Sequence, residues 1–214
     1  MKTWKGSRMG SVGIIRAEWL VALALVMSSS WSIAQDTGTI SGTVDNRRVR
    51  RAAAVIYVEK IPGKEFPVSE IAAVMDQIDL AFTPHVLPVQ VGGTVDFPNS
   101  DSVRHSVFSS RRSAQQMNLG TYDAGVTRHI QMDTVGATTL LCNVHAEMSG
   151  YLITVETPFF TTTDADGRFE IANVPAGTHS LTIWHERLET TTLEDVVVNA
   201  GETTEVVFEG VGNR

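Results

Sequence analysis

The sequence has no apolar run of the ~20 residues that a membrane-spanning helix needs. Its one marked apolar run, Trp19–Met27, follows four Lys and Arg residues among the first 16 positions and precedes small residues up to Ala34. This order is that of a secretory signal peptide. We therefore expect residues 1–34 to be a signal peptide that is cleaved after Ala34, and the rest of the chain to be periplasmic. A retained N-terminal anchor is the alternative.

Cysteine is nearly absent, since Cys142 is the only one in 214 residues. A single cysteine excludes a disulfide bond within the chain. Structural cysteines of exported proteins usually occur in pairs, and a lone thiol in an oxidising compartment is a liability unless something occupies it. A bound metal ion would do so.

Basic residues are scarce after residue 34. Four of the 17 Lys and Arg residues and one of the 24 Asp and Glu residues lie within 1–34, which leaves 13 basic against 23 acidic residues and a formal net charge of −10. A surface of this sign argues against nucleic acid and anionic membranes as partners. We expect no nucleic acid partner, and no membrane span after cleavage of the signal peptide.

Sustained helical periodicity is missing as well. Short segments rich in Val, Ile and Thr alternate with turns of Gly, Pro, Asp and Asn, as at Thr39–Val44, Ala54–Glu59, Val86–Val91 and Thr203–Phe208. This spacing predicts an all-β protein built from sandwiches or barrels. Only Pro67–Asp76 is expected to hold a short helix, of one or two turns.

Cys142 belongs to a Cys-x₂-His-x₂-Met motif completed by His145 and Met148. The spacing puts a thiolate, an imidazole and a thioether on one tight loop between two apolar segments. Soft sulfur with imidazole favours copper over the hard cations. Each residue alone is explained by ordinary core packing, but the combination indicates a copper site. Zinc is the weaker alternative, because structural zinc sites use closed sets of Cys and His.

A second histidine, His105, follows the stretch Val91–Asn99 (VGGTVDFPN). With this stretch and the Cys-x₂-His-x₂-Met loop, residues 72–157 resemble the cupredoxins, a family that includes plastocyanin and amicyanin. The resemblance implies a Greek-key β-sandwich at residues 66–158 that binds one copper ion, Cu(I) or Cu(II).

The same resemblance implies the ligands. His105, Cys142 and His145 would be the equatorial copper ligands and Met148 the weak axial one. Ser106 stands where many cupredoxins have Asn, and Ala146 stands where amicyanin-like loops have Pro. Both departures bear on the redox potential, because hydrogen bonds and packing around the ligands set it.

The C-terminal part carries a second resemblance. TDADGRFEIANVPAGTHSLTIW, residues 163–184, is similar to the carboxypeptidase regulatory-like domain, a small transthyretin-like or Ig-like β-sandwich. The opening strands of that family stand far upstream here, within residues 38–59. We therefore expect a discontinuous domain, residues 36–62 and 159–212, that holds the copper domain as an insertion. Two consecutive domains are the competing layout. The combination also resembles bacterial proteins labelled methylamine-utilisation or plastocyanin-like.

Other polar residues have less defined roles. Whether His85 or His185 approaches the metal is left open. Trp184–Glu186 is interpreted as a domain interface. Arg47–Arg51 (RRVRR) is interpreted as a solvated turn, with docking of an acidic redox partner as the alternative.

No catalytic arrangement stands out, and four protein ligands would leave no open position on the metal for a substrate. We therefore expect no enzyme. The sequence favours a periplasmic type 1 (blue) copper protein that carries single electrons between redox partners such as a dehydrogenase or a cytochrome. The alternatives are a copper-binding or sequestering protein, a cell-surface interaction protein without electron transfer, and, more weakly, a carbohydrate-binding sandwich without metal.

Overall fold

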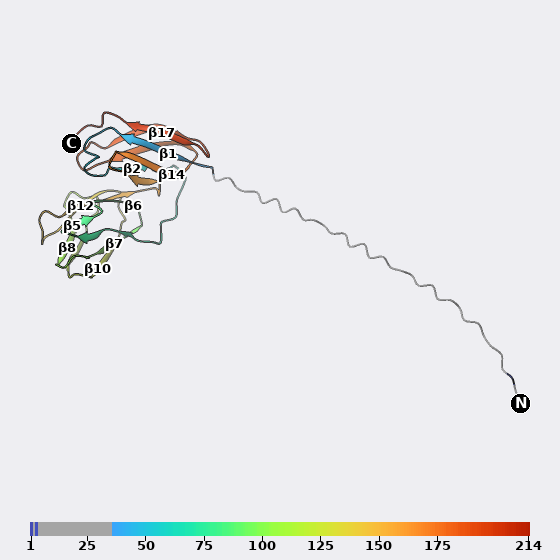
Figure 1. Cartoon of the computed structure of the whole chain (residues 1–214), viewed down its shortest axis with the longest axis horizontal. Helices are drawn as coiled ribbons and strands as arrows, with labels where there is room; N and C mark the ends of the chain where they lie inside the picture. The colour runs from blue at the N-terminus through green and yellow to red at the C-terminus, as the bar shows by residue number, and fades with distance from the viewer. Residues whose placement is uncertain (2, 4–35) are drawn as a thin grey trace. The chain divides into compact units, whose positions relative to one another are not determined.

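The structure, a computed structural model, describes residues 1, 3 and 36–214 (Figure 1). All but two residues of the expected signal peptide lie outside the described residues, so its cleavage site stays a prediction. Every regular element of the described part is a β-strand, which confirms the all-β class. No helix in the described residues has the length and apolar character that crossing a membrane requires.

Seven strands form what we call the flanking sandwich. They are β1 (Thr37–Val44), β2 (Val55–Val58), β13 (Phe160–Thr162), β14 (Arg168–Pro175), β15 (Gly177–Trp184), β16 (Thr191–Val198) and β17 (Thr203–Phe208). One sheet has the order β14-β1-β17 and the other the order β13-β2-β15-β16. β1 lies antiparallel to β14 and parallel to β17, while β2 lies antiparallel between β13 and β15.

Alternation of side chains explains how these strands build a core. In β1, Gly38, Ile40 and Val44 are buried while Ser41 and Thr43 face outward, as the two-residue period of a strand requires. Ile40 packs in a buried cluster that also contains residues of strands much later in the chain, among them Ile171 and Phe208.

The other ten strands form the central sandwich. They are β3 (Ala73–Val74), β4 (Asp76–Ile78), β5 (Ala81–Thr83), β6 (Val86–Gln90), β7 (Thr94–Pro98), β8 (His105–Ser109), β9 (Asn118–Tyr122), β10 (Thr127–Gln131), β11 (Gly136–Leu141) and β12 (Ser149–Val155). A five-stranded sheet, β6-β12-β11-β8-β9, faces a three-stranded one, β10-β7-β3, and β4 and β5 form a hairpin. Between them lies a second core, with Phe97, Leu140 and Leu152 fully buried.

The expected helix within Pro67–Asp76 is wrong. β3 pairs in parallel with β7, and β4 begins at Asp76. Exposure alternates here, with Val74 exposed, Met75 fully buried and Gln77 fully buried. Pairing with the neighbouring strand therefore decides the conformation of this short segment over its local preference.

A third apolar cluster joins the two sandwiches. Trp184 and Val55 of the flanking sandwich pack with Val86, Ile153 and Val155 of the central one. The ring of Trp184 also lies 5.2 Å, centroid to centroid, from that of Tyr151. This packing fits the interpretation of Trp184–Glu186 as a domain interface.

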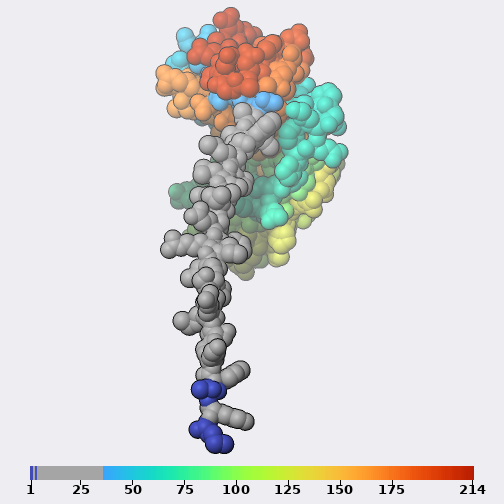
Figure 2. Space-filling view, turned by 90° about the vertical axis from the view of Figure 1, so that its right-hand side faces the viewer, coloured from blue at the N-terminus to red at the C-terminus, as the bar shows by residue number. Residues whose placement is uncertain are grey.

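Strands far apart in the sequence thus share the flanking sandwich. Figure 2 shows blue atoms of the early strands against orange and red atoms of the last ones, and the pairing of β1 with β14 and β17 explains this. The arrangement favours the discontinuous layout over two consecutive domains. The boundaries 36–62, 66–158 and 159–212 stay predictions.

Gly42→Ala tests the placement of β1. A Cβ atom at Gly42 would press against the carbonyl oxygen of Val206 and lie 2.8 Å from Cζ of Phe169. Because overpacking of this kind costs about 1–3 kcal/mol, we expect the free energy of unfolding to fall by that amount in chemical denaturation. Ser41→Ala, on the outward face of the same strand, should change it by less than about 0.5 kcal/mol. Equal stability of the two variants would contradict this placement of β1.

Candidate metal centre

The pairing of β8 with β11 positions the candidate ligands. In this antiparallel pair Leu141, the last residue of β11, lies opposite Phe108, so the first residues of β8 run alongside the segment that follows β11. His105 is the first residue of β8 and Cys142 follows the last residue of β11. His145 lies in the loop that leads from there into β12. The strand pair therefore brings together two residues, His105 and Cys142, that have 36 residues between them in the sequence.

Three of the four expected ligands come together. The ligand-type atoms of His105, Cys142 and His145 all lie within 4.8 Å of one another. The Nδ1 atoms of the two histidines are 3.1 Å apart, and their ring planes are tilted by 60°. His105 and Cys142 are buried, whereas His145 is half-buried.

Met148 lies on the same loop, directly before β12. Its side chain is buried and belongs to the same apolar cluster as Cys142. Its backbone N–H donates to the carbonyl oxygen of His145, at 3.1 Å, which closes a tight turn. The expected axial ligand is therefore held inside the core at the end of the ligand loop.

Asp101 fixes the ring of His105. Its Oδ2 atom lies 2.6 Å from Nε2 of His105, and its two carboxylate oxygens accept the backbone N–H groups of Asp79 and Leu80 at 2.7 and 3.0 Å. Burial raises the pKa of Asp101, but the Leu80 N–H, the His105 ring and the Asp79 N–H outweigh it, so the pKa lies below its ordinary value.

The bond to Asp101 also assigns the tautomer of His105. A carboxylate accepts hydrogen bonds, so Nε2 carries a proton, and Nδ1 is the nitrogen left to hold a metal ion. Nδ1 faces the space shared with His145. A carboxylate that holds the far nitrogen of a histidine is the usual partner of a metal-ligating imidazole.

Ser106 ties the thiol to the ligand loop. Its backbone N–H and its hydroxyl lie 3.4 and 3.7 Å from Sγ of Cys142, both as donors. The same hydroxyl accepts the backbone N–H of Asn143 at 2.7 Å. The short side chain at this position thus reaches both the sulfur and the loop, in place of the Asn of many cupredoxins.

The thiol of Cys142 is strongly acidic as a result. Burial raises its pKa, but the backbone N–H groups of Ser106, His145 and Val144 and the His105 ring lower it, to about 6 against an ordinary value of 9.0. A thiolate is the form of cysteine that binds metal. Two imidazole nitrogens and a thiolate fit a borderline or soft transition metal ion, copper above all, and do not fit a hard cation.

The two histidines left open by the sequence lie outside this cluster. His85 is largely exposed and lies 3.5 Å from Glu186. His185 is buried, with Nε2 3.1 Å from the carbonyl oxygen of Ala52 and Nδ1 accepting the N–H of Arg187 at 3.1 Å. Neither belongs to the group of candidate ligands found among the described residues.

Sequence reasoning missed Asp101. The one signal for it was a carboxylate four positions before His105 in a short loop, a weak signal in an acidic chain. Its role depends on a loop held by Asn99, whose side chain accepts the Asp101 N–H at 3.1 Å and donates to the Val103 carbonyl oxygen at 2.8 Å. These contacts turn the carboxylate back toward β8.

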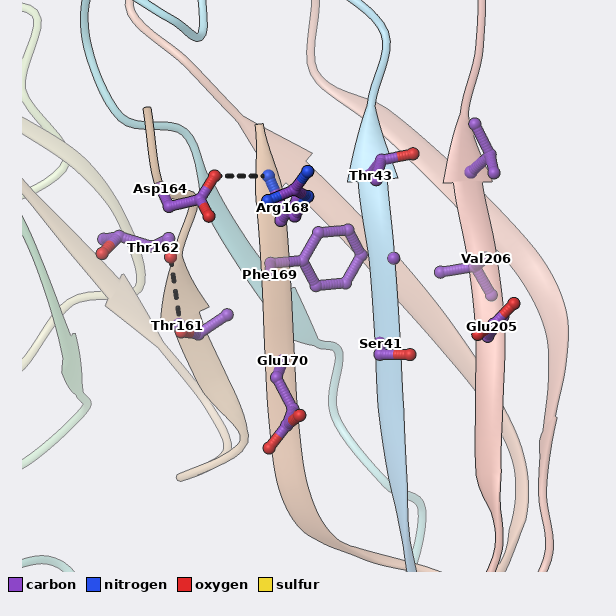
Figure 3. Close-up of a pocket in the computed structure, with 12 residues that line it drawn as sticks. Ser41, Thr43, Thr161, Thr162, Asp164, Arg168, Phe169, Glu170, Glu205 and Val206 are labelled. Carbon is purple, nitrogen blue, oxygen red and sulfur yellow. Dashed lines mark hydrogen bonds between the residues drawn. The ribbon is translucent and has the colours of Figure 1, made fainter. Parts of the chain in front are cut away.

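A hollow of about 600 Å³ lies on the flanking sandwich (Figure 3). Phe169 lies at its base, and Asp164 accepts the backbone N–H of Arg168 at 2.8 Å at its rim. Asp164 also accepts the N–H of Asp166 at 2.9 Å, so its carboxylate closes the turn before β14. The candidate ligands do not line this hollow.

The acidity of Cys142 predicts a pH dependence of the metal-free protein. The pKa of Cys142 in the folded protein lies below its ordinary value, so ionisation of the thiol stabilises the fold. This contribution is fully present above about pH 9 and is lost as the pH falls through about 6. We expect the ultraviolet absorbance of the thiolate to titrate with a midpoint of about 6. Ser106→Ala keeps the Ser106 N–H that acts on the sulfur but removes the acceptor of the Asn143 N–H, so it should lower the free energy of unfolding by about 1–2 kcal/mol. Exposed Ser102→Ala should leave the free energy of unfolding unchanged, and equal stability of the two variants would contradict the role assigned to the Ser106 hydroxyl.

Comparison with known families finds one match. Residues 144–209 match the family model of the carboxypeptidase regulatory-like domain. The match begins inside segment 66–158 and includes β12, which pairs with β11 and β6 of the central sandwich. The strands that complete the flanking sandwich, β1 and β2, stand upstream of it. No curated protein matches the chain at a significant level.

Among solved structures, a purple cupredoxin from Nitrosopumilus maritimus is similar at 22% identity, over 38% of this chain and 98% of that one, with a TM-score of 0.36. A copper-containing nitrite reductase from Thermus scotoductus SA-01 shows 20% identity over 47% of this chain and only 25% of its own, with a TM-score of 0.40. A reduced amicyanin variant shows 18% identity over 46% and 97%, with a TM-score of 0.38. Both resemblances that the sequence indicates, to cupredoxins and to the carboxypeptidase regulatory-like domain, are thus found in these comparisons.

Proposed function

We propose that this protein is a periplasmic type 1 copper protein that carries single electrons between redox partners. The observation that carries the proposal is the convergence of His105, Cys142 and His145, with their ligand-type atoms within 4.8 Å of one another. Copper, when bound there, supplies a one-electron couple between Cu(I) and Cu(II).

The chain's own residues hold this site before any metal arrives. Asp101 and the strand pair fix the ring of His105, and Ser106 fixes the sulfur of Cys142. Burial of Cys142 and Met148 in the core keeps water away from the sulfur atoms. A site fixed in this way needs little rearrangement when its charge changes by one, which favours rapid electron exchange.

His145 is the proposed port for electrons. It is the one member of the cluster that is not buried, and its neighbour Val144 exposes 47% of its surface. Ala146 is exposed too. The exposed apolar side chains of Val144 and Ala146 on either side of His145 are suited to brief docking of a redox protein such as a dehydrogenase or a cytochrome.

A carrier fits the residues better than an enzyme. With Met148 as the fourth ligand, the protein would fill the coordination sphere and leave no position for a substrate. The periplasmic location rests on the basic and apolar pattern of residues 1–34, and the absence of a partner cysteine agrees with a thiol reserved for metal.

Loading the protein with Cu(II) tests the proposal. We expect an intense thiolate-to-copper absorption band and narrow copper hyperfine splitting in paramagnetic resonance, both lost in Cys142→Ser. His85→Gln, outside the cluster, should keep both signals. Ordinary square-planar Cu(II) spectra that Cys142→Ser leaves unchanged would overturn the proposal. A blue site with sluggish oxidation of tightly held Cu(I) would instead indicate copper storage.

Asp101→Asn tests the support of the site. The amide keeps the size of the side chain but loses the charge that holds the His105 N–H. Loss of such a partner typically costs 10–100-fold in metal affinity, so we expect a fall of about that size in competition with a copper chelator. Asp123→Asn, which removes an exposed carboxylate 2.7 Å from Arg104, should leave copper affinity within about twofold. Equal affinities of the two variants would contradict a supporting role for Asp101.

A further inference from the structure

Positive charge gathers at one place on this acidic protein. A hollow of about 420 Å³ in the flanking sandwich is lined by Arg47, Arg48, Arg51 and Arg187. Three of them belong to the turn between β1 and β2, and the fourth follows β15, more than a hundred positions later. The proposed electron-transfer function uses none of them.

The turn is built to display its arginines. Asn46 begins it, with its side-chain oxygen accepting the Arg48 N–H at 3.0 Å and its carbonyl oxygen accepting the Val49 N–H at 3.2 Å. The Ala52 N–H then donates to the Arg48 carbonyl oxygen at 3.2 Å. Val49 is 2% exposed and anchors the turn in the core. Arg47 and Arg51 are left exposed at the hollow.

His185 braces the other wall. Its Nε2–H donates to the Ala52 carbonyl oxygen and its Nδ1 accepts the Arg187 N–H, each at 3.1 Å. Burial lowers its pKa, which the bond to Ala52 only partly offsets, in keeping with a neutral ring. Both ring nitrogens of His185 are engaged in backbone hydrogen bonds, so this residue connects the two walls of the hollow. The arginines are then the residues that can contact a ligand.

The arginines are not neutralised by the protein. Arg187 lies 3.4 Å from Glu186, the one carboxylate that lines the hollow, and Glu186 is shared with His85. Nε of Arg48 donates to a neutral group, Oδ1 of Asn213, at 2.7 Å. Within residues 36–214, neither Arg47 nor Arg51 has a carboxylate at ion-pair distance. Four guanidinium groups therefore face one carboxylate.

We infer that this hollow binds an oxyanion, the phosphate or sulfate group of a small molecule or of a lipid headgroup. Guanidinium groups present paired N–H donors in a plane that matches two oxygens of such a group. A concave site suits a compact anion better than the flat surface of an acidic protein. The hollow also has room for more than the bare ion, which allows an ester.

Calorimetric titration with inorganic phosphate, with glycerol phosphate and with phosphatidylglycerol vesicles tests the inference. We expect saturable binding of at least one probe. The double variant Arg47→Gln and Arg51→Gln should weaken it about tenfold or more, the loss of a charge-assisted hydrogen bond. Arg50→Gln is the matched control, since Arg50 lies in the same turn but does not line the hollow, and it should weaken binding by less than about twofold. Thermal unfolding of each variant checks that the fold is intact.

The probes separate the sources of the anion. Binding of phosphate or glycerol phosphate supports a free anion, and binding of vesicles alone supports a lipid headgroup. No saturable binding of any probe would overturn the inference. An equal loss in Arg50→Gln would also overturn it, because the turn would then act only through its net charge. Copper spectra should be unchanged in both arginine variants, which keeps this test independent of the proposed electron carrier.

Discussion

The antiparallel pairing of β8 with β11 is the constraint on which the candidate metal centre depends. It makes the first residues of β8 run alongside the segment that follows β11, so His105 and Cys142 come close without any loop having to reach across the sandwich. Ser106, the second residue of β8, then bonds both the sulfur and the first amide of the ligand loop. One residue thus holds β8, the sulfur of Cys142 and the start of the ligand loop together, and the turn that follows positions His145.

The acidity of Cys142 follows from the same constraint. A buried thiol would ordinarily be less acidic than a free one, because burial disfavours charge. Here three backbone N–H groups converge on the sulfur and outweigh burial. Their positions come from the strand pair and the tight loop, so the chemistry of the thiol is a property of backbone geometry more than of neighbouring charges.

Much of this could be predicted from sequence, for identifiable reasons. The Cys-x₂-His-x₂-Met spacing fixes a tight loop by itself, which is why the placement of Cys142 and His145 was accessible. The all-β class followed from short Val- and Thr-rich segments between turn residues. The helix expected within residues 67–76 was wrong because a segment this short takes its conformation from the strand it pairs with. Asp101 was missed because its role arises from a loop conformation, and no spacing rule marks it. The sequence indicates a solvated turn at Arg47–Arg51, or a docking site for an acidic redox partner, and it does not predict the hollow because Arg187 joins that turn only through the fold.

The pairing of β1 and β2 with strands from the end of the chain has a mechanical consequence. The chain passes from the flanking sandwich to the central one after β2 and returns to it before β13. On the return, only residues 156–159 separate β12 from β13. Two anchored ends remove the swivel that a single linker would permit, and the apolar contacts of Trp184 remove more. The sandwich that carries the ligand loop and the one that carries the arginine-lined turn are thus held together by two chain connections and a shared apolar cluster.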